Sequence, residues 1–335
     1  MSKSLPRYVV FGEALTDMVR QADGNWLGLP GGSCWNVARV GARLGIDTAF
    51  AGAVSQDLFG DELTRASEQA GLDMRFLQRV DRSPFLAFVA SRHPPQYFFV
   101  GDDSADLHFE PSRLPQGWRQ AAEVIHFGSI SLARQPLAAC LCEEATQAAG
   151  AGKRIAFDPN YRKLMNAPGY GEALAHMLRL ASYVKISDED LAGLFPALAL
   201  DAALAQVRDM APGATIMLTR GADGLTLLSS DSVVEQPAFR VNVVDTVGCG
   251  DAAMGGWIAA VLAEPRPDLA ARAGRPGRLT ATRNEPASNS QPLARHPRRR
   301  DVGIDMADSS WAWRCPVIWR GYGHAPVARQ RFARR

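Results

Sequence analysis

Residues 245–256, Asp-Thr-Val-Gly-Cys-Gly-Asp-Ala-Ala-Met-Gly-Gly, combine a glycine-rich turn with an acid at the start of an apolar run. The glycines let the backbone approach a ligand closely, and the amides of Gly248, Cys249 and Gly250 at a helix start can hold a phosphate or a developing negative charge. Asp251 falls in the first helical turn, where its carboxylate can take a proton from an attacking hydroxyl. Backbone amides that stabilise charge, together with a positioned base, are most of what phosphoryl transfer requires.

Polar residues near the first predicted strand are candidates for binding a substrate, because ligands of open α/β sheets bind outside the carboxyl ends of the strands. Asp17 lies there and can accept hydrogen bonds from sugar hydroxyls, although a solvated turn acid is the plainer interpretation. A double glycine, Gly31-Gly32, then precedes a helix that has Asn36 near its start. The amide of Gly32 and the side chain of Asn36 can contact a polyol, while Ser33 is the expected N-cap.

Three later segments combine turn residues with charged or hydroxyl side chains. Residues 157–162, Phe-Asp-Pro-Asn-Tyr-Arg, suit a phosphate or hydroxyl site, or form a β-turn around the proline. Residues 187–190, Ser-Asp-Glu-Asp, place acids where a helix begins; they are ordinary capping residues, or one of them holds a hydrated Mg²⁺ beside phosphates. Residues 219–224, Thr-Arg-Gly-Ala-Asp-Gly, form a hairpin turn or a backbone wall for nucleotide phosphates.

Short apolar runs alternate with amphipathic segments up to about residue 263, which predicts a mainly parallel sheet with helices on both faces. Strands are predicted at 7–11, 48–54, 123–128, 154–157, 182–186, 214–219, 224–229 and 239–243. Helices are predicted at 34–44, 59–70, 134–149, 170–181, 188–195, 200–210 and 250–263. Segments 85–91 and 96–100 predict instead a β-hairpin that serves as a lid on this domain.

The composition predicts a globular protein, since 47% of the 335 residues are apolar. Residues 265–335 hold 15 of the 37 basic residues and 5 of the 35 acids, so residues 1–264 carry a formal net charge of −8. Nucleic-acid binding by this acidic body is not expected. The apolar run at residues 8–11 is too short for a secretory signal, and no stretch approaches membrane-spanning length. We therefore expect a cytoplasmic protein that binds no membrane.

The five cysteines and six histidines indicate neither a disulfide framework nor a metal site. The cysteines are odd in number and lack a C-x-x-C pair, so reduced thiols are expected. The histidines have no ligand spacing, and we predict no metal-ligating residue. Cys249 lies at a helix start, where thiol pKa values fall, but no histidine is spaced near it as a base, which disfavours a nucleophilic role.

The composition changes after Glu264. Arg, Ala, Pro and Gly make up 39 of the 71 residues 265–335, and lysine is absent beside 15 arginines. One interpretation is a disordered basic tail. The other is a slipped reading frame in GC-rich DNA, which yields these residue types in excess and agrees better with the three tryptophans of this segment. We divide the chain into a domain at 1–264, with a lid from about 12–32 and 85–106, and an atypical tail at 265–335.

Taken together, these motifs resemble those of the PfkB (ribokinase-like) family of sugar kinases. Its closing signature, Asp-Thr-x-Gly-Ala-Gly-Asp, is matched by residues 245–251 with cysteine in place of alanine. Its opening signature, a double glycine followed shortly by Asn-Val-Ala, is matched within residues 31–38. Residues 12–17 and 158–162 look more like the fructokinase branch than like ribokinase. The resemblance covers residues 7 to about 263.

The resemblance implies a three-layer ribokinase-like sandwich with a mainly parallel central sheet and a small β lid. It also implies an ATP-dependent sugar kinase that transfers the γ-phosphate of ATP to a hydroxyl of a ketose or related sugar. Asp251 would be the base, expected to stay ionised near a helix N-terminus, and the amides of Gly248, Cys249 and Gly250 would hold the transferred phosphoryl group.

The remaining roles that the resemblance implies concern binding. The sugar would contact Asp17, Gly32 and Asn36, with Asn160 and Arg162 toward the phosphates. The nucleotide and its ion would lie along Lys185, Asp190, Thr219, Gly221 and Gly224. The implied cofactors are ATP with Mg²⁺ and a monovalent cation such as K⁺, and the implied protein partner is a second copy, joined through the lid.

The chain departs from the family pattern at two places within the matched region. Ser187 and Asp190 stand where members usually carry the Asn and Glu of Asn-x-x-Glu, and residues 98–103 stand where fructokinases often carry a Tyr-Arg pair. Two alternatives therefore remain open: a ribokinase- or nucleoside-type kinase, and a sugar- or nucleotide-binding relic that the altered C-terminus has inactivated.

Overall fold

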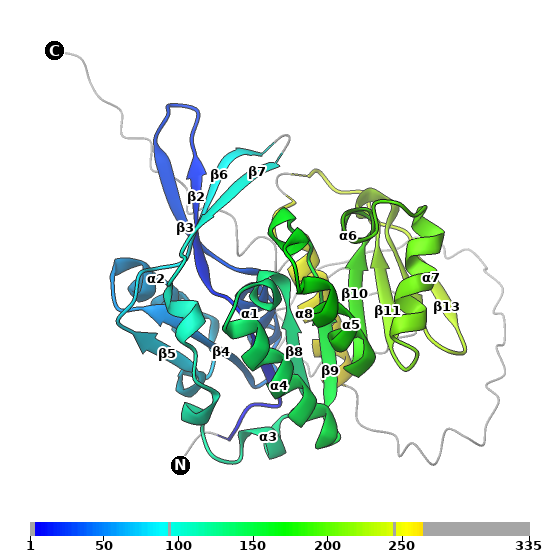
Figure 1. Ribbon diagram of the computed structural model, residues 1–335, viewed down its shortest axis with the longest axis horizontal. Coiled ribbons are helices and arrows are strands. Elements are labelled where there is room, and N and C mark those ends of the chain that lie inside the picture. The colour runs from blue at the N-terminus through cyan, green and yellow to red at the C-terminus, as the bar shows by residue number, and fades with distance from the viewer. Residues whose placement is uncertain (1–3, 93–94, 244–245, 264–335) are drawn as a thin grey trace, which may run out of the picture.

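A central sheet runs through the computed structural model, which describes residues 4–92, 95–243 and 246–263 (Figure 1). Within these residues the sheet has nine strands in the order β13-β12-β11-β10-β9-β8-β1-β4-β5. The strands are β1 (Tyr8–Phe11), β4 (Thr48–Ser55), β5 (Leu77–Val80), β8 (Val124–Gly128), β9 (Arg154–Asp158), β10 (Ala181–Ser187), β11 (Thr215–Thr219), β12 (Leu225–Leu228) and β13 (Val233–Gln236). The run from β11 to β5 is parallel, and β12 and β13 add an antiparallel edge.

Helices cover both faces of this sheet, as predicted. The side chains of β1 alternate between two cores: Val9 and Phe11 pack with α4 (Leu137–Gly150), α5 (Tyr170–Leu180) and α7 (Leu200–Met210). Tyr8 and Val10 pack on the other face with α1 (Ser33–Arg43), α2 (Leu58–Ala70) and α8 (Cys249–Ala263). Figure 1 shows α4 and α5 in front of the sheet and α8 behind it. Two cores on one sheet make a three-layer sandwich, so the predicted fold class is confirmed.

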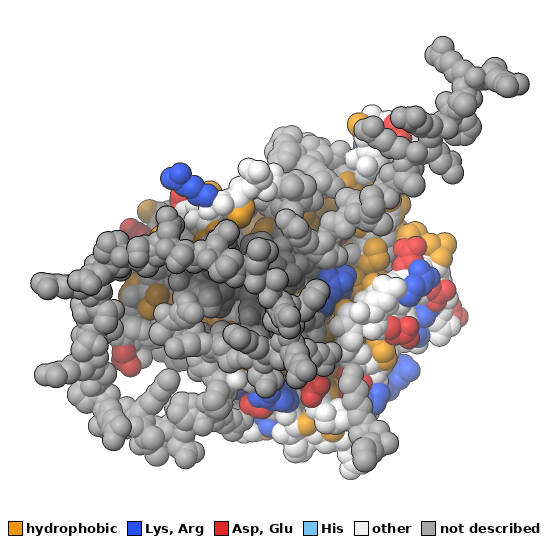
Figure 2. Space-filling view, turned by 180° about the vertical axis from the view of Figure 1, so that it is seen from behind, with side chains coloured by type: hydrophobic (Ala, Val, Ile, Leu, Met, Phe, Trp, Pro, Cys, Tyr) orange, Lys and Arg blue, Asp and Glu red, His pale blue; other side chains and the backbone are white. Residues whose placement is uncertain are grey.

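The other helices are short. They are α3 (Trp118–Ala121), α6 (Asp188–Leu194) and the 3₁₀ segments η1 (Met74–Phe76), η2 (Ala105–His108), η3 (Pro111–Arg113), η4 (Ser129–Ala133), η5 (Lys163–Asn166) and η6 (Gly221–Asp223). The helices that the structure describes are too short or too polar to span a bilayer. On the face in Figure 2, described basic and acidic side chains are interspersed rather than gathered into a basic patch.

A second, four-stranded sheet rises from the body in Figure 1. Its strands are β2 (Leu15–Arg20), β3 (Trp26–Gly31), β6 (Leu86–Arg92) and β7 (Pro95–Val100), in the order β3-β2-β6-β7. The pair β6–β7 is the hairpin that the sequence predicts at 85–91 and 96–100, and the parallel pairing of β2 with β6 joins it to the β2–β3 hairpin. The small β lid is therefore confirmed.

One predicted strand is wrong. Residues 239–243 form no strand, and the last strand of the sheet is β13, which returns antiparallel to β12 through a turn closed by Ser229 and Ser232. The alternating apolar residues at 239–243 predicted burial, but Val241 and Val243 are exposed. Four strands were also missed: β5 and β13, which are short, and β2 and β3, whose residues predicted only a polar turn and a lid segment.

Candidate active site

The first turns of α1 and α8 meet above the carboxyl ends of the central strands. The two helices pack closely because a glycine of α8 faces α1: a Cβ atom at Gly255 would lie 2.7 Å from Cβ of Val40. The start of α1 follows Gly32, whose φ of 109° is a conformation that glycine adopts readily. This packing brings Asp251 of α8 against the first turn of α1, although the two segments lie far apart in the sequence.

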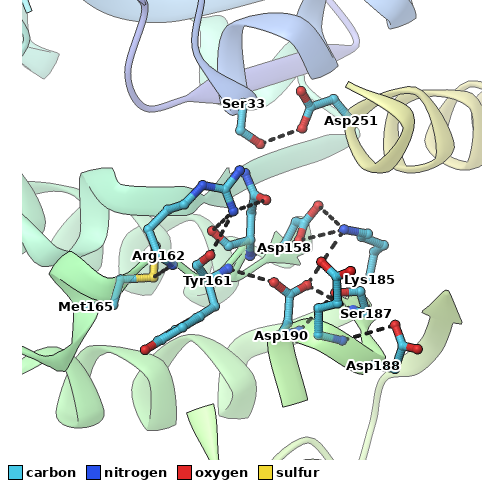
Figure 3. Close-up of polar contacts among 12 residues, drawn as sticks. Ser33, Asp158, Tyr161, Arg162, Met165, Lys185, Ser187, Asp188, Asp190 and Asp251 are labelled. Carbon is cyan, nitrogen blue, oxygen red and sulfur yellow. Dashed lines mark hydrogen bonds and ion pairs between the residues drawn. The ribbon is translucent and has the colours of Figure 1, made fainter. Parts of the chain in front are cut away.

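Asp251 is 8% exposed and is held by two side chains of α1. The hydroxyl of Ser33 donates to Oδ1 of Asp251 at 2.7 Å (Figure 3). Nδ2 of Asn36 donates to Oδ2 at 2.9 Å. The expected N-capping role of Ser33 is wrong, since α1 has no side-chain cap and the hydroxyl bonds to Asp251 instead. Asn36, expected at the sugar, also contacts Asp251; its contact with a sugar stays a prediction.

Burial raises the pKa of Asp251, while the Ser33 and Asn36 bonds and the charges of Lys185 and Arg162 lower it. The net direction is upward, so burial outweighs the neighbours that favour the carboxylate. The expectation that Asp251 stays ionised considered only the helix N-terminus and omitted this desolvation. A carboxyl whose pKa moves toward the working pH is a better general base, so the shift suits proton abstraction.

The backbone before Asp251 differs in one respect from the predicted anion site. Gly248 has a φ of 79°, which a side chain would strain, and it shapes the turn into α8. The Cys249 amide donates to the Thr246 carbonyl at 3.2 Å, so it is engaged in the turn and not free for a phosphoryl group. The amides of Gly248 and Gly250 remain the candidates, and their role stays a prediction. Asp245, the first residue of this signature, lies outside the described residues.

Asp17 lies on the lid strand β2, with its carboxylate packed against Gly31 of the neighbouring strand β3. Burial raises the pKa of Asp17 to about 6; Arg162 opposes this shift, and Asp251 and Glu13 add to it. The charge of Asp251 acts on the Asp17 carboxylate, so the two carboxylates lie in the same part of the molecule. Asp17 is thus brought to the same site as the candidate base, as the sequence predicts.

The segment after β9 turns Asn160 and Arg162 toward the same site. The amide of Asn160 donates to Oδ1 of Asp158 at 3.1 Å, and its φ of 42° is rare for a residue with a side chain. The guanidinium of Arg162 donates to Oδ1 of Asn160 at 3.0 Å and to the carbonyl of Tyr161 at 2.7 Å. Its charge acts on both Asp17 and Asp251.

Lys185 and Asp190 are held by the protein itself. Lys185 is 3% exposed, and its Nζ lies 3.2 Å from Oδ2 of Asp158 and 3.9 Å from Oδ2 of Asp190 (Figure 3). Asp190 accepts the amides of Tyr161 and Ser187 at 2.8 and 2.9 Å, so it caps α6 and fixes the segment after β9. The capping interpretation of Asp190 is confirmed, and its contact with a cofactor stays a prediction. The enclosure of Lys185 by carboxylates does not support its predicted contact with phosphates.

Glu13 was missed as a site residue. It is 1% exposed, and its Oε1 accepts the Ser33 amide at 3.1 Å while its Oε2 accepts the Ser131 hydroxyl. It therefore links the end of β1 and the segment after β8 to the residue that bonds to Asp251. Burial raises the pKa of Glu13. The available signal was an acid placed two residues after a buried strand.

The carboxyl end of β11 and the turn after it contain Thr219, Gly221 and Gly224. In the sheet β11 follows β10, on the side away from β9. Thr219 is in register with Ser187 at the end of β10. Gly221 and Gly224, with φ of 49° and 91°, reverse the chain into β12, and the carbonyl of Gln236 packs directly against Gly224. The hairpin interpretation of 219–224 is confirmed, and a nucleotide contact there stays a prediction.

The profile of the family described as pfkB family carbohydrate kinase matches residues 6–292. The chain belongs to the PfkB family. It is therefore a carbohydrate kinase, a phosphotransferase with an alcohol group as acceptor. The matched range extends past residue 263, where the motif resemblance ends. The structure of that added stretch lies outside the described residues.

Curated relatives of this PfkB kinase carry two kinds of name. Aminoimidazole riboside kinase of Salmonella typhimurium is 32% identical over 262 residues, which are 76% of this chain and 81% of that protein. Fructokinase of Klebsiella pneumoniae is 32% identical over 264 residues, covering 77% and 85%. Both names describe kinases that phosphorylate a sugar or a riboside.

Solved structures of similar proteins agree with the fold. Fructokinase of Xylella fastidiosa with bound ATP has a TM-score of 0.69 at 31% identity, over 76% of this chain and 81% of that chain. Aminoimidazole riboside kinase of Salmonella enterica, complexed with aminoimidazole riboside and an ATP analog, has a TM-score of 0.68 at 30% identity, over 79% and 88%. The PfkB kinase thus has the fold of kinases crystallised with ATP or an analog of it.

Proposed function

We propose that this PfkB kinase transfers the γ-phosphate of ATP to a hydroxyl of a ketose or related sugar, with a ketose of the fructose type as the leading substrate. The observation that carries the proposal is the buried carboxylate of Asp251, held by Ser33 and Asn36 and facing Asp17 and Arg162 across the site. Such a carboxylate can take the hydroxyl proton while the start of α8 faces the developing charge.

The chain's residues have separate tasks in this mechanism. Asp17 accepts hydrogen bonds from sugar hydroxyls and orients the sugar so that one hydroxyl reaches Asp251. Asp251 would receive the proton of that hydroxyl as the oxygen attacks the γ-phosphorus, the bond from that phosphorus to the β–γ bridging oxygen breaks, and ADP leaves. Arg162 and the amides of Gly248 and Gly250 stabilise the charge on the transferred phosphoryl group. Gly32 lets the backbone approach the sugar, and Thr219, Gly221 and Gly224 border the nucleotide.

Mg²⁺ is proposed to arrive with the triphosphate. The described residues hold no group of three or more His, Cys, Asp or Glu side chains arranged around one point. Side chains spaced in this way fit an ion that is held chiefly by phosphates and water, as Mg²⁺ in nucleotide sites usually is. The ion would neutralise phosphate charge during transfer. The residues that the family resemblance implies for K⁺ follow α8 and lie outside the described residues.

A substrate panel tests the proposed function. The purified full-length chain is supplied with ATP, Mg²⁺ and, in turn, fructose, ribose, aminoimidazole riboside and adenosine, and ADP release is measured with a coupled assay. We expect turnover with fructose to exceed that with the other acceptors. Preference for aminoimidazole riboside would favour the second candidate function, a ribokinase- or nucleoside-type kinase, which the 32% identity to aminoimidazole riboside kinase supports. Binding of sugar and ATP without ADP release would favour the inactive relic.

We further propose that the chain forms a homodimer through its lid, and that it works in the cytoplasm. The lid face opposite Asp17 is apolar: Phe88 stacks on Phe98 and meets Trp26 edge-on. Trp26 and Phe98 are 41% and 52% exposed, as large apolar side chains at an interface would be before association.

Replacing Phe98 by Asp should convert a dimer into a monomer, because it places a charge in the centre of this apolar face. Light scattering coupled to gel filtration measures the mass. The matched control is Leu58→Asp, an exposed leucine at the start of α2 rather than in the lid, which should leave the dimer intact. A wild-type chain that is monomeric at all concentrations would refute the lid dimer.

A further inference from the structure

Lys185 is a buried cation next to the active site that has its own anchor. It lies on β10 and its side chain is 4% exposed. Its Nζ lies 3.2 Å from Oδ2 and 3.4 Å from Oδ1 of Asp158, whose side chain is 1% exposed. A pair that is closed off from solvent in this way is fixed in position, because either charge alone would be left uncompensated in the interior.

The ammonium of Lys185 packs against the first turn of α8. A Cβ atom at Gly250 would lie 2.8 Å from Nζ of Lys185, closer than real Cβ contacts allow. Gly250 directly precedes Asp251, so the absence of a side chain at residue 250 leaves room for a positive charge beside the base. In Figure 3 Lys185 and Asp158 lie between the start of α8, with Asp251, and the capped start of α6.

The groups that face Lys185 come from four elements. They are Asp158 of β9, Asp190 of α6, Asp251 of α8 and His126 of β8. Desolvation by itself lowers the pKa of Lys185, but the three carboxylates together raise it above its ordinary value. Burial and the charge of Lys185 lower the pKa of His126 to about 3, so the imidazole is neutral. Among Lys185 and the four groups that face it, Lys185 therefore carries the positive charge at neutral pH.

We propose that Lys185 is a positioning residue, which Asp158 anchors under the first turn of α8 so that a fixed positive charge supports Asp251 without touching sugar or nucleotide. The importance of Asp251 as a base rests on the proposed function, whereas the placement of Lys185 does not. The proposal replaces the expectation that Lys185 binds phosphate, since both of its close partners are carboxylates of the protein.

The direction of the expected change in the pKa of Asp251 depends on the groups that act on its carboxylate. They are Ser33 and Asn36 of α1, Lys185 of β10, Arg162 after β9, and the nearby carboxylates of Asp17 on β2 and Asp158 on β9. Lys185 lowers the pKa of Asp251, so its removal should raise that pKa. A base with a higher pKa is protonated at a higher pH, and the acid limb of the rate profile must move upward.

Lys185→Met tests the proposal, with Lys153→Met as the matched control. Lys153 lies before β9, where its Nζ donates to the carbonyl of Gln120. In Lys185→Met we expect the acid limb of kcat/KM to move up by about one pH unit, the scale of a nearby opposite charge. We expect kcat to fall by about 10- to 100-fold through misplacement of Asp251, with the KM for ATP nearly unchanged. A large rise in the KM for ATP with an unmoved acid limb would overturn the proposal in favour of a phosphate ligand.

A second pair of variants keeps Lys185 and moves it. Gly250→Ala places a methyl group 2.8 Å from the present position of Nζ, so the ammonium must move, and Gly256→Ala adds the same group to α8 at a point with no atom within 4 Å. We expect the acid limb to rise in Gly250→Ala and to stay in place in Gly256→Ala. Equal profiles for the two variants would argue against the support of α8 by Lys185.

Two further measurements keep the test decisive. If Lys185→Met fails to fold because Asp158 is left unpaired, Lys185→Met/Asp158→Asn removes both charges together, and it is compared with Asp158→Asn alone because the two charges act on Asp251 in opposite directions. An Asp251 pKa no higher in the double variant than in Asp158→Asn overturns the proposal. The pKa itself is read without turnover from the ¹³C carboxyl resonance of Asp251, assigned by its loss in Asp251→Asn. A shifted resonance in a chain that phosphorylates no sugar would sink the proposed function and leave the placement of Lys185 standing.

Discussion

Replacing Asp251 by Asn should lower kcat by about 10²- to 10⁴-fold, the range that a positioned general base contributes, and should change the sugar dissociation constant by only a few-fold. The amide has nearly the same shape as the carboxylate but cannot take a proton from the attacking hydroxyl. Steady-state kinetics with the preferred sugar, together with calorimetric measurement of sugar binding, checks both parts. Near-normal turnover in Asp251→Asn would remove this residue from the mechanism.

The control for this variant is Asp201→Asn, since Asp201 is also an acid in the first turn of a helix but is exposed. It should retain full activity. Loss of folding is not expected in Asp251→Asn. Because the folded state raises the pKa of Asp251, ionisation of that carboxyl at neutral pH opposes folding, and the neutral amide avoids this cost. A melting temperature at or above that of the wild type would show that lost turnover is chemical.

The pH dependence of the wild type follows from the same residue. The base works only when ionised, so kcat/KM should fall as the pH drops through the pKa of Asp251. Burial raises that pKa, and the acid limb should therefore lie above the ordinary range of an aspartate. A flat profile down to the ordinary aspartate pKa would contradict the desolvated position of this carboxyl.

Asp17→Asn should raise the KM for the sugar by about 100-fold and leave the KM for ATP nearly unchanged. Hydrogen bonds to a charged group are worth about 1.5–3 kcal/mol each, and an amide that retains one acceptor loses a large part of that energy. In the wild type, sugar affinity should also fall as the pH drops through about 6, where Asp17 becomes protonated. Its carboxylate is then lost as a strong acceptor, so the KM for the sugar rises.

Asp23→Asn is the matched control, because Asp23 is an exposed acid in the turn between the lid strands β2 and β3. It lies on the same hairpin as Asp17, so any general loosening of the lid would appear in both variants. We expect a rise in the sugar KM only for Asp17→Asn. An equal change in both variants would assign the effect to lid stability rather than to sugar contact.

Most elements of the body could be predicted because their apolar periodicity is local. The helices α1, α2, α5, α7 and α8 and the strands that carry the site fall within a few residues of their predicted ranges. The strand predicted at 239–243 failed because its apolar residues are exposed, a property that depends on which neighbours pack against them. The lid strand β2 escaped prediction because its partner β6 lies far along the chain, and β3 joins the lid only through β2.

The site was harder to predict than the fold. Asp251 and Asp17 could be named as candidates because an acid beside a glycine-rich turn or at a strand end is a local signal. Ser33 was misassigned as a cap, since its partner is 218 residues away. Glu13 went unrecognised, since its buried contacts are with Ser33 and Ser131.

The amino-acid sequence alone determines the class of this protein: glycines, an acid and an apolar run at fixed local spacing specify a phosphoryl-transfer turn, and alternating periodicities specify a layered α/β fold. Only the tertiary structure decided which groups surround the carboxylate of Asp251. Packing of α8 against α1 through Gly255, and of Lys185 beneath Gly250, brought distant residues within hydrogen-bond or charge contact. Such contacts depend on the desolvation and geometry of side chains far apart in the chain, which no local pattern encodes.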